Sequence, residues 1–222
     1  MGNIIDDLQS IKKRDPACRN ILEVIFLYAG FHALFFYRIA HFFYKHHFFF
    51  IARFISQTAR WLTGIEIHPG ATIGRGLFID HGSGVVIGET TEIGDYCTLY
   101  QGVTLGGTGN VKGKRHPTLG NDVLVGAGAK ILGPFKVGDH SKVAAGAVVL
   151  HEVPPYATAV GVPAQIICGF VAKPDITKEG NEDIDQVNIE DPIVQELNRM
   201  AEQIDKLSTR IRELEKKSSR DL

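Results

Sequence analysis

Cysteine is scarce in this sequence, and its scarcity limits what the protein can be. The chain of 222 residues has only Cys18, Cys97 and Cys168. Three scattered cysteines form neither an even-numbered disulfide framework nor the paired spacing of a structural zinc site. We therefore expect reduced thiols in a cytoplasmic protein, and no bound metal.

Long basic runs and long apolar runs are also missing. The formal net charge is -1, which argues against nucleic acid as the main partner. The uncharged run from Val24 to Tyr37 is cut by Glu23 and Arg38, so it falls short of the roughly 20 residues that span a membrane. We expect a buried helix there and no membrane span. Binding at a membrane surface stays open, because residues 41–50 mix phenylalanines with histidines.

A secretory signal is not apparent either. Residues 1–10 are polar and carry Asp6 and Asp7, where a signal peptide has a basic start followed by an apolar run.

What the sequence does contain is a six-residue repeat between Ile65 and Val153. An aliphatic residue recurs every sixth position, and a glycine often follows it. Six residues suit one short strand plus a corner, and three such sides close one coil of a parallel β-solenoid. A sandwich would instead need turns every eight to twelve residues. The three frames of the repeat are Ile67, Ile73, Ile79 and Val85, then Ile87, Ile93, Leu99 and Leu105, then Leu119, Val125, Ile131, Val137, Val143 and Val149.

We find one interruption of this repeat, between Leu105 and Leu119. Residues 106–118 are too rich in glycine and polar side chains to form a wall of the solenoid, so they predict a protruding loop. Insertions of this kind carry binding groups in solenoids, which makes Arg115 and His116 a candidate site.

The flanking segments read as helices and a tail. Residues 1–64 predict a helical domain, with a first helix stopped by Asp15-Pro16, a second starting near Pro16, and a close helix contact or a break at Gly30. The β-helix then covers 65–170. An acidic linker follows over 171–192, and heptad spacing over 193–217 predicts a coiled coil.

Several motifs more specific than the repeat resemble those of bacterial serine O-acetyltransferases, over roughly residues 10 to 170. The resemblance implies a left-handed parallel β-helix that assembles as trimers or as dimers of trimers. It also implies transfer of an acetyl group from acetyl-CoA to L-serine in cysteine biosynthesis. The motifs are Asp15-Pro16-Ala17, Gly30-Phe31-His32-Ala33, Ile67-His68-Pro69, Ile73-Gly74-Arg75-Gly76, Asp80-His81, Gly88-Glu89-Thr90, residues 103–109, Arg115-His116-Pro117 and Gly161-Val162-Pro163-Ala164.

The resemblance implies a role for each candidate side chain. A serine hydroxyl is a poor nucleophile until a base removes its proton, and His81 matches that base. Glu66 matches the carboxylate that orients its ring, where the family more often has aspartate.

Asp15 and Asp80 would bind the ammonium of serine, and Arg115 would bind its carboxylate through the planar guanidinium. His116 would contact the substrate or assist proton transfer. For acetyl-CoA the matching positions are small residues that let an extended pantetheine approach the backbone, namely Gly107, Ala127, Gly128 and Ala145.

The resemblance further implies feedback inhibition by L-cysteine, which keeps the ammonium and carboxylate of serine. It also implies docking of the C-terminus on O-acetylserine sulfhydrylase. This chain ends in Leu222 where the family commonly has isoleucine, and the predicted coiled coil is the competing role for the tail.

Three alternatives stay open at this point. One is an acetyltransferase of the same repeat class acting on a sugar or another small hydroxyl or amine. A second is a zinc hydratase on the same solenoid, for which His81 and His116 lack an evident third histidine. A third is a scaffold without catalysis, which does not explain the Asp80-His81 and Arg115-His116 pairs.

Overall fold

The computed structural model describes residues 4–109, 112–168, 203, 204 and 206. Nearly all of the predicted linker and coiled coil, together with the end of the chain, therefore lie outside the described residues.

Four helices precede the strands. They are α1 (Ile4–Arg14), α2 (Ile21–Leu27), α3 (Ala29–Lys45) and α4 (Phe49–Thr63). α1 ends before Asp15-Pro16, as predicted. The prediction that the second helix starts near Pro16 is wrong, because the Asn20 side chain accepts a hydrogen bond from the Glu23 N–H and caps α2 there. α4 ends where Gly64 adopts the left-handed conformation, with φ of 72°.

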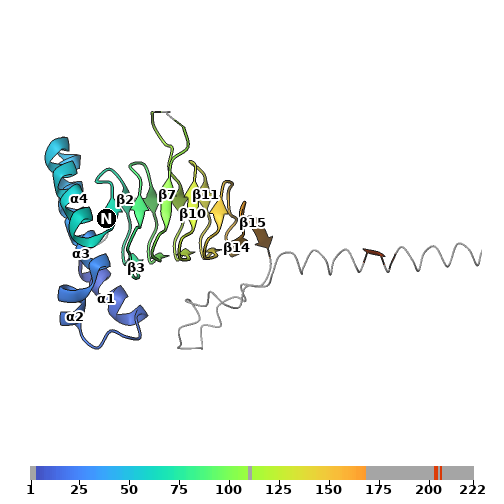
Figure 1. Ribbon diagram of the computed structural model, residues 1–222, viewed down its shortest axis with the longest axis horizontal. Coiled ribbons are helices and arrows are strands. Elements are labelled where there is room, and N and C mark those ends of the chain that lie inside the picture. Colours follow the sequence, from blue (N-terminus) through green and yellow to red (C-terminus); the bar gives the residue numbers. More distant parts are fainter. Residues whose placement is uncertain (1–3, 110–111, 169–202, 205, 207–222) are drawn as a thin grey trace, which may run out of the picture. The chain divides into compact units, whose positions relative to one another are not determined.

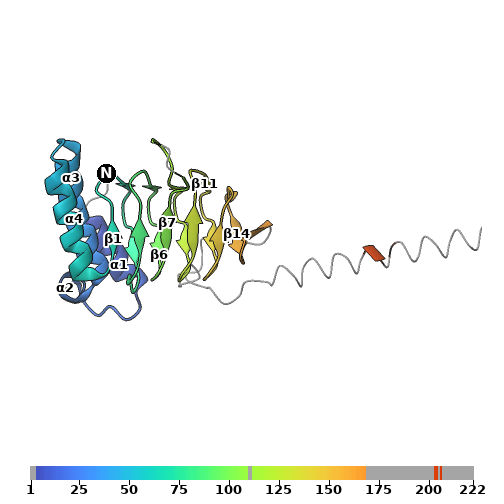
Figure 2. The ribbon, with the colours of Figure 1, turned by 45° about the horizontal axis from the view of Figure 1, so that its top comes forward.

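Fifteen short strands follow among the described residues, and they stack into three sheets (Figures 1 and 2). The first side is β1-β4-β7-β10-β13, the second is β2-β5-β8-β11, and the third is β3-β6-β9-β12-β14-β15. All pairs are parallel except β14 with β15, which turns back at the end. The strands are β1 (Glu66–Ile67), β2 (Thr72–Ile73), β3 (Phe78–Ile79), β4 (Val86–Ile87), β5 (Glu92–Ile93), β6 (Thr98–Leu99), β7 (Thr104–Gly106), β8 (Thr118–Leu119), β9 (Leu124–Val125), β10 (Lys130–Leu132), β11 (Lys136–Val137), β12 (Lys142–Val143), β13 (Val148–Val149), β14 (Ala157–Val160) and β15 (Gln165–Cys168).

Strand register confirms the repeat as a β-helix. Ile67 pairs with Ile87, Ile87 with Leu105, and Leu105 with Ile131, so equivalent aliphatic residues stack along one side. These side chains are almost completely buried and form the core of the coil stack. This is the left-handed parallel β-helix that the resemblance implied.

The prediction of a single interruption is wrong, because residues 80–84 interrupt the repeat as well. Ile67 pairs with Ile87 and not with Val85, so the corner between β3 and β4 holds two extra residues. Its backbone turns tightly, with positive φ at His81, Gly82 and Gly84. The predicted loop between β7 and β8 protrudes from the wall in Figure 1.

The helices cap the first coil of the β-helix. No earlier coil satisfies the main-chain carbonyls of this coil, so side chains of α1, α3 and α4 donate hydrogen bonds to them. The pairs are Ser10 to Gly76, Tyr37 to Ala71, Arg38 to Ile73 and Gly74, His41 to Pro69, and Ser56 to Ile67, at 2.7 to 3.2 Å.

A buried ion pair fixes α1 against this cap. Asp7 is 1% exposed and lies 3.0 Å from Arg38, and its carboxylate also accepts the N–H of Gly76 at 3.0 Å. Burial raises the pKa of Asp7, while Arg38 opposes the rise. Removing either partner would leave a buried charge alone, so this pair holds α1 in one position.

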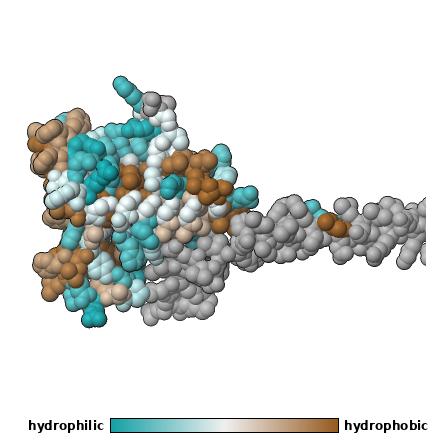
Figure 3. Space-filling model, viewed as in Figure 1, coloured by the Kyte–Doolittle hydropathy of each residue, from teal (hydrophilic) through white to brown (hydrophobic). Residues whose placement is uncertain are grey.

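Exposed apolar side chains gather on the outer faces of the helices (Figure 3). Phe50, Phe54 and Trp61 of α4 are among the most exposed. Of the helices in the described part of the chain, none is by itself both long enough and apolar enough to cross a membrane.

Candidate active site

An apolar cluster brings three helices and one strand together. Ile11 of α1, Val24 of α2, Phe31 of α3 and Phe78 of β3 are buried in it, and Tyr28 packs against it. Asp15 follows α1 and Asp80 follows β3, so the packing of this cluster determines the positions of both carboxylates.

Asp15 and Asp80 interact electrostatically at this junction. Burial raises the pKa of Asp80, and the negative charge of Asp15 raises it further, while His81 opposes the rise. Asp15 accepts a hydrogen bond from the Ala17 N–H at 2.7 Å and another from the Tyr28 hydroxyl at 2.5 Å. The charges of these two predicted site residues are therefore close enough to influence each other.

His81 lies beside Asp80 on the corner between β3 and β4. Its side chain is 76% exposed, and its Nε2 lies 3.8 Å from Asp80 Oδ1. The predicted partner Glu66 is ion-paired with Arg60 of α4, at 3.1 Å.

A column of glycines continues along this same corner. Gly84, Gly102, Gly128 and Gly146 have φ between 70° and 76°, and a Cβ built on Gly128 or Gly146 would meet nothing within 4 Å. Ala127 and Ala145 precede the last two glycines, and Ala127 O accepts the N–H of Gly146 at 2.8 Å. The wall beyond His81 is therefore smooth and made largely of backbone.

Arg115 belongs to a second cluster, at the corner between the first and second sides. Its guanidinium is paired with Glu89, which also accepts a hydrogen bond from the Tyr44 hydroxyl at 3.1 Å. The hydrogen bond from Arg115 is the main reason why the pKa of Glu89 is lowered. The Tyr44 side chain therefore links α3 to this cluster.

His116 is buried below Arg115. Its Nδ1 lies 2.9 Å from Thr90 Oγ1 and accepts the Thr90 N–H at 3.2 Å. Burial and the charge of Arg115 lower the pKa of His116. A Cβ on Gly107 would come within 3.2 Å of His116 Nε2, so this predicted cofactor position lies against the second cluster and not in the glycine column.

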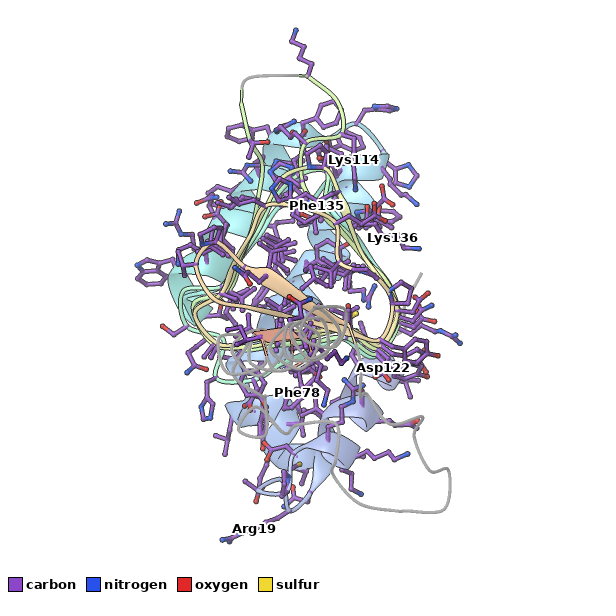
Figure 4. All side chains as sticks on the ribbon, turned by 90° about the vertical axis from the view of Figure 1, so that its right-hand side faces the viewer. Arg19, Phe78, Lys114, Asp122, Phe135 and Lys136 are labelled. Carbon is purple, nitrogen blue, oxygen red and sulfur yellow. The ribbon has the colours of Figure 1, made fainter. Side chains whose placement is uncertain are left out.

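The two clusters occupy different corners of the chain. Residues 80–84 join the third side to the first, whereas residues 107–117 join the first side to the second. Figure 4, which looks along the β-helix, shows Lys114 of the loop and Phe78 of β3 on opposite sides. The structure does not bring Asp80 and His81 together with Arg115 and His116 within one chain.

Tyr28, Tyr44, Glu89 and Thr90 were not assigned roles from the sequence. Glu89 and Thr90 belong to Gly88-Glu89-Thr90, one of the motifs that carry the family resemblance, so the sequence does contain a signal for them. The two tyrosines reach the site only because the helices pack against the β-helix. The six-residue repeat does not indicate how the helices pack. Within the described part of the chain, no group of three His, Cys, Asp or Glu residues is arranged to hold a metal ion.

Two family models match the chain. "Serine acetyltransferase, N-terminal" covers residues 1–35, and "Bacterial transferase hexapeptide (six repeats)" covers residues 116–151. Serine acetyltransferase of Bacillus subtilis is 50% identical over 199 residues, which are 90% of this chain and 89% of that protein. The Helicobacter pylori (strain ATCC 700392 / 26695) enzyme is 65% identical over 160 residues, 72% of this chain and 94% of its own length.

Solved structures agree with these matches. Neisseria gonorrhoeae serine acetyltransferase in complex with serine has a TM-score of 0.71 and 41% identity, covering 74% of this chain and 67% of its own. A serine acetyltransferase in complex with cysteine has a TM-score of 0.78 and 40% identity, covering 84% of this chain and 70% of its own. The chain spans about two thirds of the Neisseria protein. By its identity to relatives that it covers almost completely, the chain belongs to the serine acetyltransferase family.

Proposed function

We propose that the protein transfers the acetyl group of acetyl-CoA to the hydroxyl of L-serine in the cytoplasm, giving O-acetyl-L-serine and CoA. This reaction supplies the activated serine from which cysteine is made. The relatives named serine acetyltransferase cover most of this chain, and they support the proposal.

The observation that carries serine as the acceptor is the carboxylate pair next to His81. Burial is the main cause of the raised pKa of Asp80, and the like charge of Asp15 adds to the rise. A substrate ammonium between Asp15 and Asp80 would relieve that repulsion. A sugar acceptor has no cation to place there.

In the proposed reaction His81 removes the proton of the serine hydroxyl, and the oxygen attacks the thioester carbonyl. The tetrahedral intermediate collapses with cleavage of the C–S bond, and the imidazolium returns its proton to the sulfur of CoA. Asp80 is the carboxylate nearest to His81 in the described contacts. Glu66 remains our proposal for orienting the ring, a role that requires its carboxylate to turn away from Arg60.

The remaining half of the serine site requires a second copy of the chain. Gly84 and Gly88 bound the first side, and at about 3.3 Å per strand residue they are roughly 13 Å apart. Serine is too small to bridge that separation within one chain. We propose that Arg115 and His116 of a neighbouring copy complete the site, binding the carboxylate and assisting proton transfer, in a trimer or a dimer of trimers.

We propose that acetyl-CoA lies along the glycine column, against Ala127, Gly128 and Ala145, with its thioester at His81. The absence of side chains there lets pantetheine approach main-chain groups closely. Gly107, by its place under the second cluster, would contact the cofactor from the neighbouring copy.

The test is CoA release from acetyl-CoA with a panel of acceptors, namely L-serine, L-threonine, ethanolamine, 3-hydroxypropanoate and a hexose. We expect turnover with L-serine and little with acceptors that lack either the ammonium or the carboxylate. Faster turnover with the hexose would overturn the proposal and favour the sugar alternative.

L-cysteine is proposed as a competitive inhibitor, and the cysteine complex of a relative supports this. Docking of Leu222 on O-acetylserine sulfhydrylase and the competing coiled coil stay predictions, because both fall on residues outside the described part.

A further inference from the structure

Tyr28 occupies an unusual place between α2 and α3. It is both the C-cap of α2 and the N-cap of α3, with φ of −91° and ψ of 107°. At such an N-cap position Ser, Thr, Asp or Asn normally bonds the first turn, but Tyr28 makes no side-chain cap bond to α3. A position that gives up a local stabilising contact is a candidate for another role.

The Tyr28 side chain has two well-defined contacts. Its ring packs against the apolar cluster of Ile11, Val24, Phe31 and Phe78. Its hydroxyl donates to Asp15 Oδ2 at 2.5 Å. Burial raises the pKa of Tyr28, and the hydrogen bond to Asp15 raises it further, so the phenol keeps its proton and remains a donor.

This hydrogen bond completes the support of Asp15. The Ala17 N–H holds Oδ1 at 2.7 Å, and Tyr28 holds Oδ2. With both oxygens fixed, the carboxylate cannot rotate about its last bond, and each oxygen keeps a lone pair for a further donor. The ring that supplies the second donor packs against the apolar cluster that includes Phe78, two residues before Asp80.

We propose that Tyr28 is a positioning residue for the substrate ammonium, because its hydroxyl fixes the Asp15 carboxylate in the orientation that faces Asp80. This inference rests on the proposed function and adds a residue to its serine site. Tyr28 acts through Asp15 and does not need to touch the substrate.

The test is steady-state kinetics of Tyr28→Phe, which keeps the ring in the cluster and removes only the hydroxyl. Hydrogen bonds to charged groups are worth enough that we expect the serine KM to rise about tenfold. kcat should stay within about twofold and the acetyl-CoA KM should not change, because the thioester site is untouched. Tyr28→Trp, which keeps a ring but displaces the donor, should lose serine affinity in the same way.

Tyr37→Phe is the matched control. The Tyr37 hydroxyl is as well bonded as that of Tyr28, at 2.7 Å from Ala71 O, and it is buried, but it supports only the cap of the first coil. We expect Tyr37→Phe to lower the melting temperature and leave the serine KM unchanged. Tyr28→Phe should show the reverse pattern when both are assayed well below their melting temperatures.

A double-mutant cycle decides whether Tyr28 acts through Asp15. Calorimetric titration with L-serine should show about tenfold weaker binding for Tyr28→Phe in the native background and no further loss in Asp15→Asn. An equal loss in both backgrounds, or a serine KM within twofold of the wild type, overturns the inference while the wild-type enzyme stays active. A wild-type protein that neither binds nor acetylates L-serine overturns the proposed function as well.

Discussion

Gly30 of α3 lies directly against the main chain of Ile79. A Cβ built on Gly30 would stand 2.3 Å from the Ile79 carbonyl oxygen and 3.0 Å from Ile79 Cβ. Only a residue without a side chain permits this approach, and the chain reaches Asp80 one residue later. This contact therefore links the packing of α3 on the β-helix to the position of Asp80, a proposed serine-binding residue.

Gly30→Ala should therefore destabilise the fold and weaken serine binding together. The methyl group meets backbone, which cannot move aside cheaply, so we expect a loss of about 1–3 kcal/mol in the free energy of unfolding. The serine KM should rise several-fold because Asp80 shifts. Gly161→Ala is the control, since a Cβ there would meet only Pro163 O, at an ordinary contact distance of 3.8 Å, while its positive φ of 95° strains any side chain. It should cost stability without changing the serine KM.

His81→Ala should lower kcat by about a hundredfold to ten-thousandfold, the range for loss of a general base. Binding of acetyl-CoA, measured by calorimetry, should persist. His140→Ala is a matched control, because His140 has nearly the same φ, 57° against 56°, but lies at the corner between the second and third sides, where it is paired with Asp122. Near-normal turnover of His81→Ala would move the base elsewhere.

Arg115→Lys should raise the serine KM about tenfold with a smaller change in kcat. Lysine keeps the charge but cannot hold Glu89 and a substrate carboxylate with one planar group. Arg75→Lys provides the comparison, since Arg75 forms a 2.8 Å ion pair with Asp95 on another corner and is 54% exposed. If the two variants have the same serine KM, Arg115 does not bind serine.

Stability should fall on acidification because of His68. Burial lowers its pKa to about 4, and its Nδ1 accepts the N–H of Gly70 at 3.0 Å. The unfolded histidine binds a proton near pH 6.5, so between pH 6.5 and 4 the unfolded state holds more protons, and stability drops as the pH falls through this window. Burial lowers the pKa values of His41 and His116 in the same direction.

His68→Asn keeps an acceptor that cannot titrate in this range. This substitution should make the loss of unfolding free energy between pH 6.5 and 4 smaller by roughly 2 kcal/mol, a value that is reduced to allow for the partial exposure of the ring. His46→Asn, at an exposed position after α3, should leave the slope unchanged. Denaturant titrations at several pH values measure both, and a slope that His68→Asn does not alter would refute the prediction.

Cys97 should not carry the acetyl group. It is completely buried, and burial raises the pKa of its thiol to about 12, so almost no thiolate forms near neutral pH. Mass spectrometry after incubation with acetyl-CoA alone should detect no acetylated Cys97. Iodoacetamide should label the half-buried Cys18 before Cys97 in the native protein. A trapped acetyl-Cys97 would replace direct transfer with a two-step mechanism.

The β-helix could be predicted from the sequence, but one of its corners could not. Each side buries two positions, the aliphatic residue of the strand and the residue two places before it. The change from the frame that ends at Val85 to the frame that starts at Ile87 marks the Asp80–Gly84 corner, but both residues are aliphatic and fully buried, so this step does not stand out as an interruption. The long loop was detectable because its composition changes, whereas the short insertion changes only the register.

The site could be predicted only as separate motifs. The Asp80-His81 and Arg115-His116 pairs are readable, but their positions on different corners depend on strand register. Glu66 shows a further limit, because its Arg60 partner comes from α4, and no periodicity within the β-helix reports how a helix docks. Tyr28 and Tyr44 went unassigned for the same reason.

The hydrogen bonds from the helices to the first coil also explain how the solenoid ends. A bare parallel edge is a template on which another molecule's last coil could add, and repeated addition would build a fibre. Ser10, Tyr37, Arg38, His41 and Ser56 occupy the acceptors of that edge, and at the other end the antiparallel β15 pairs with β14 on the third side. The helical segment is therefore a terminator of polymer growth as well as the support of Asp15.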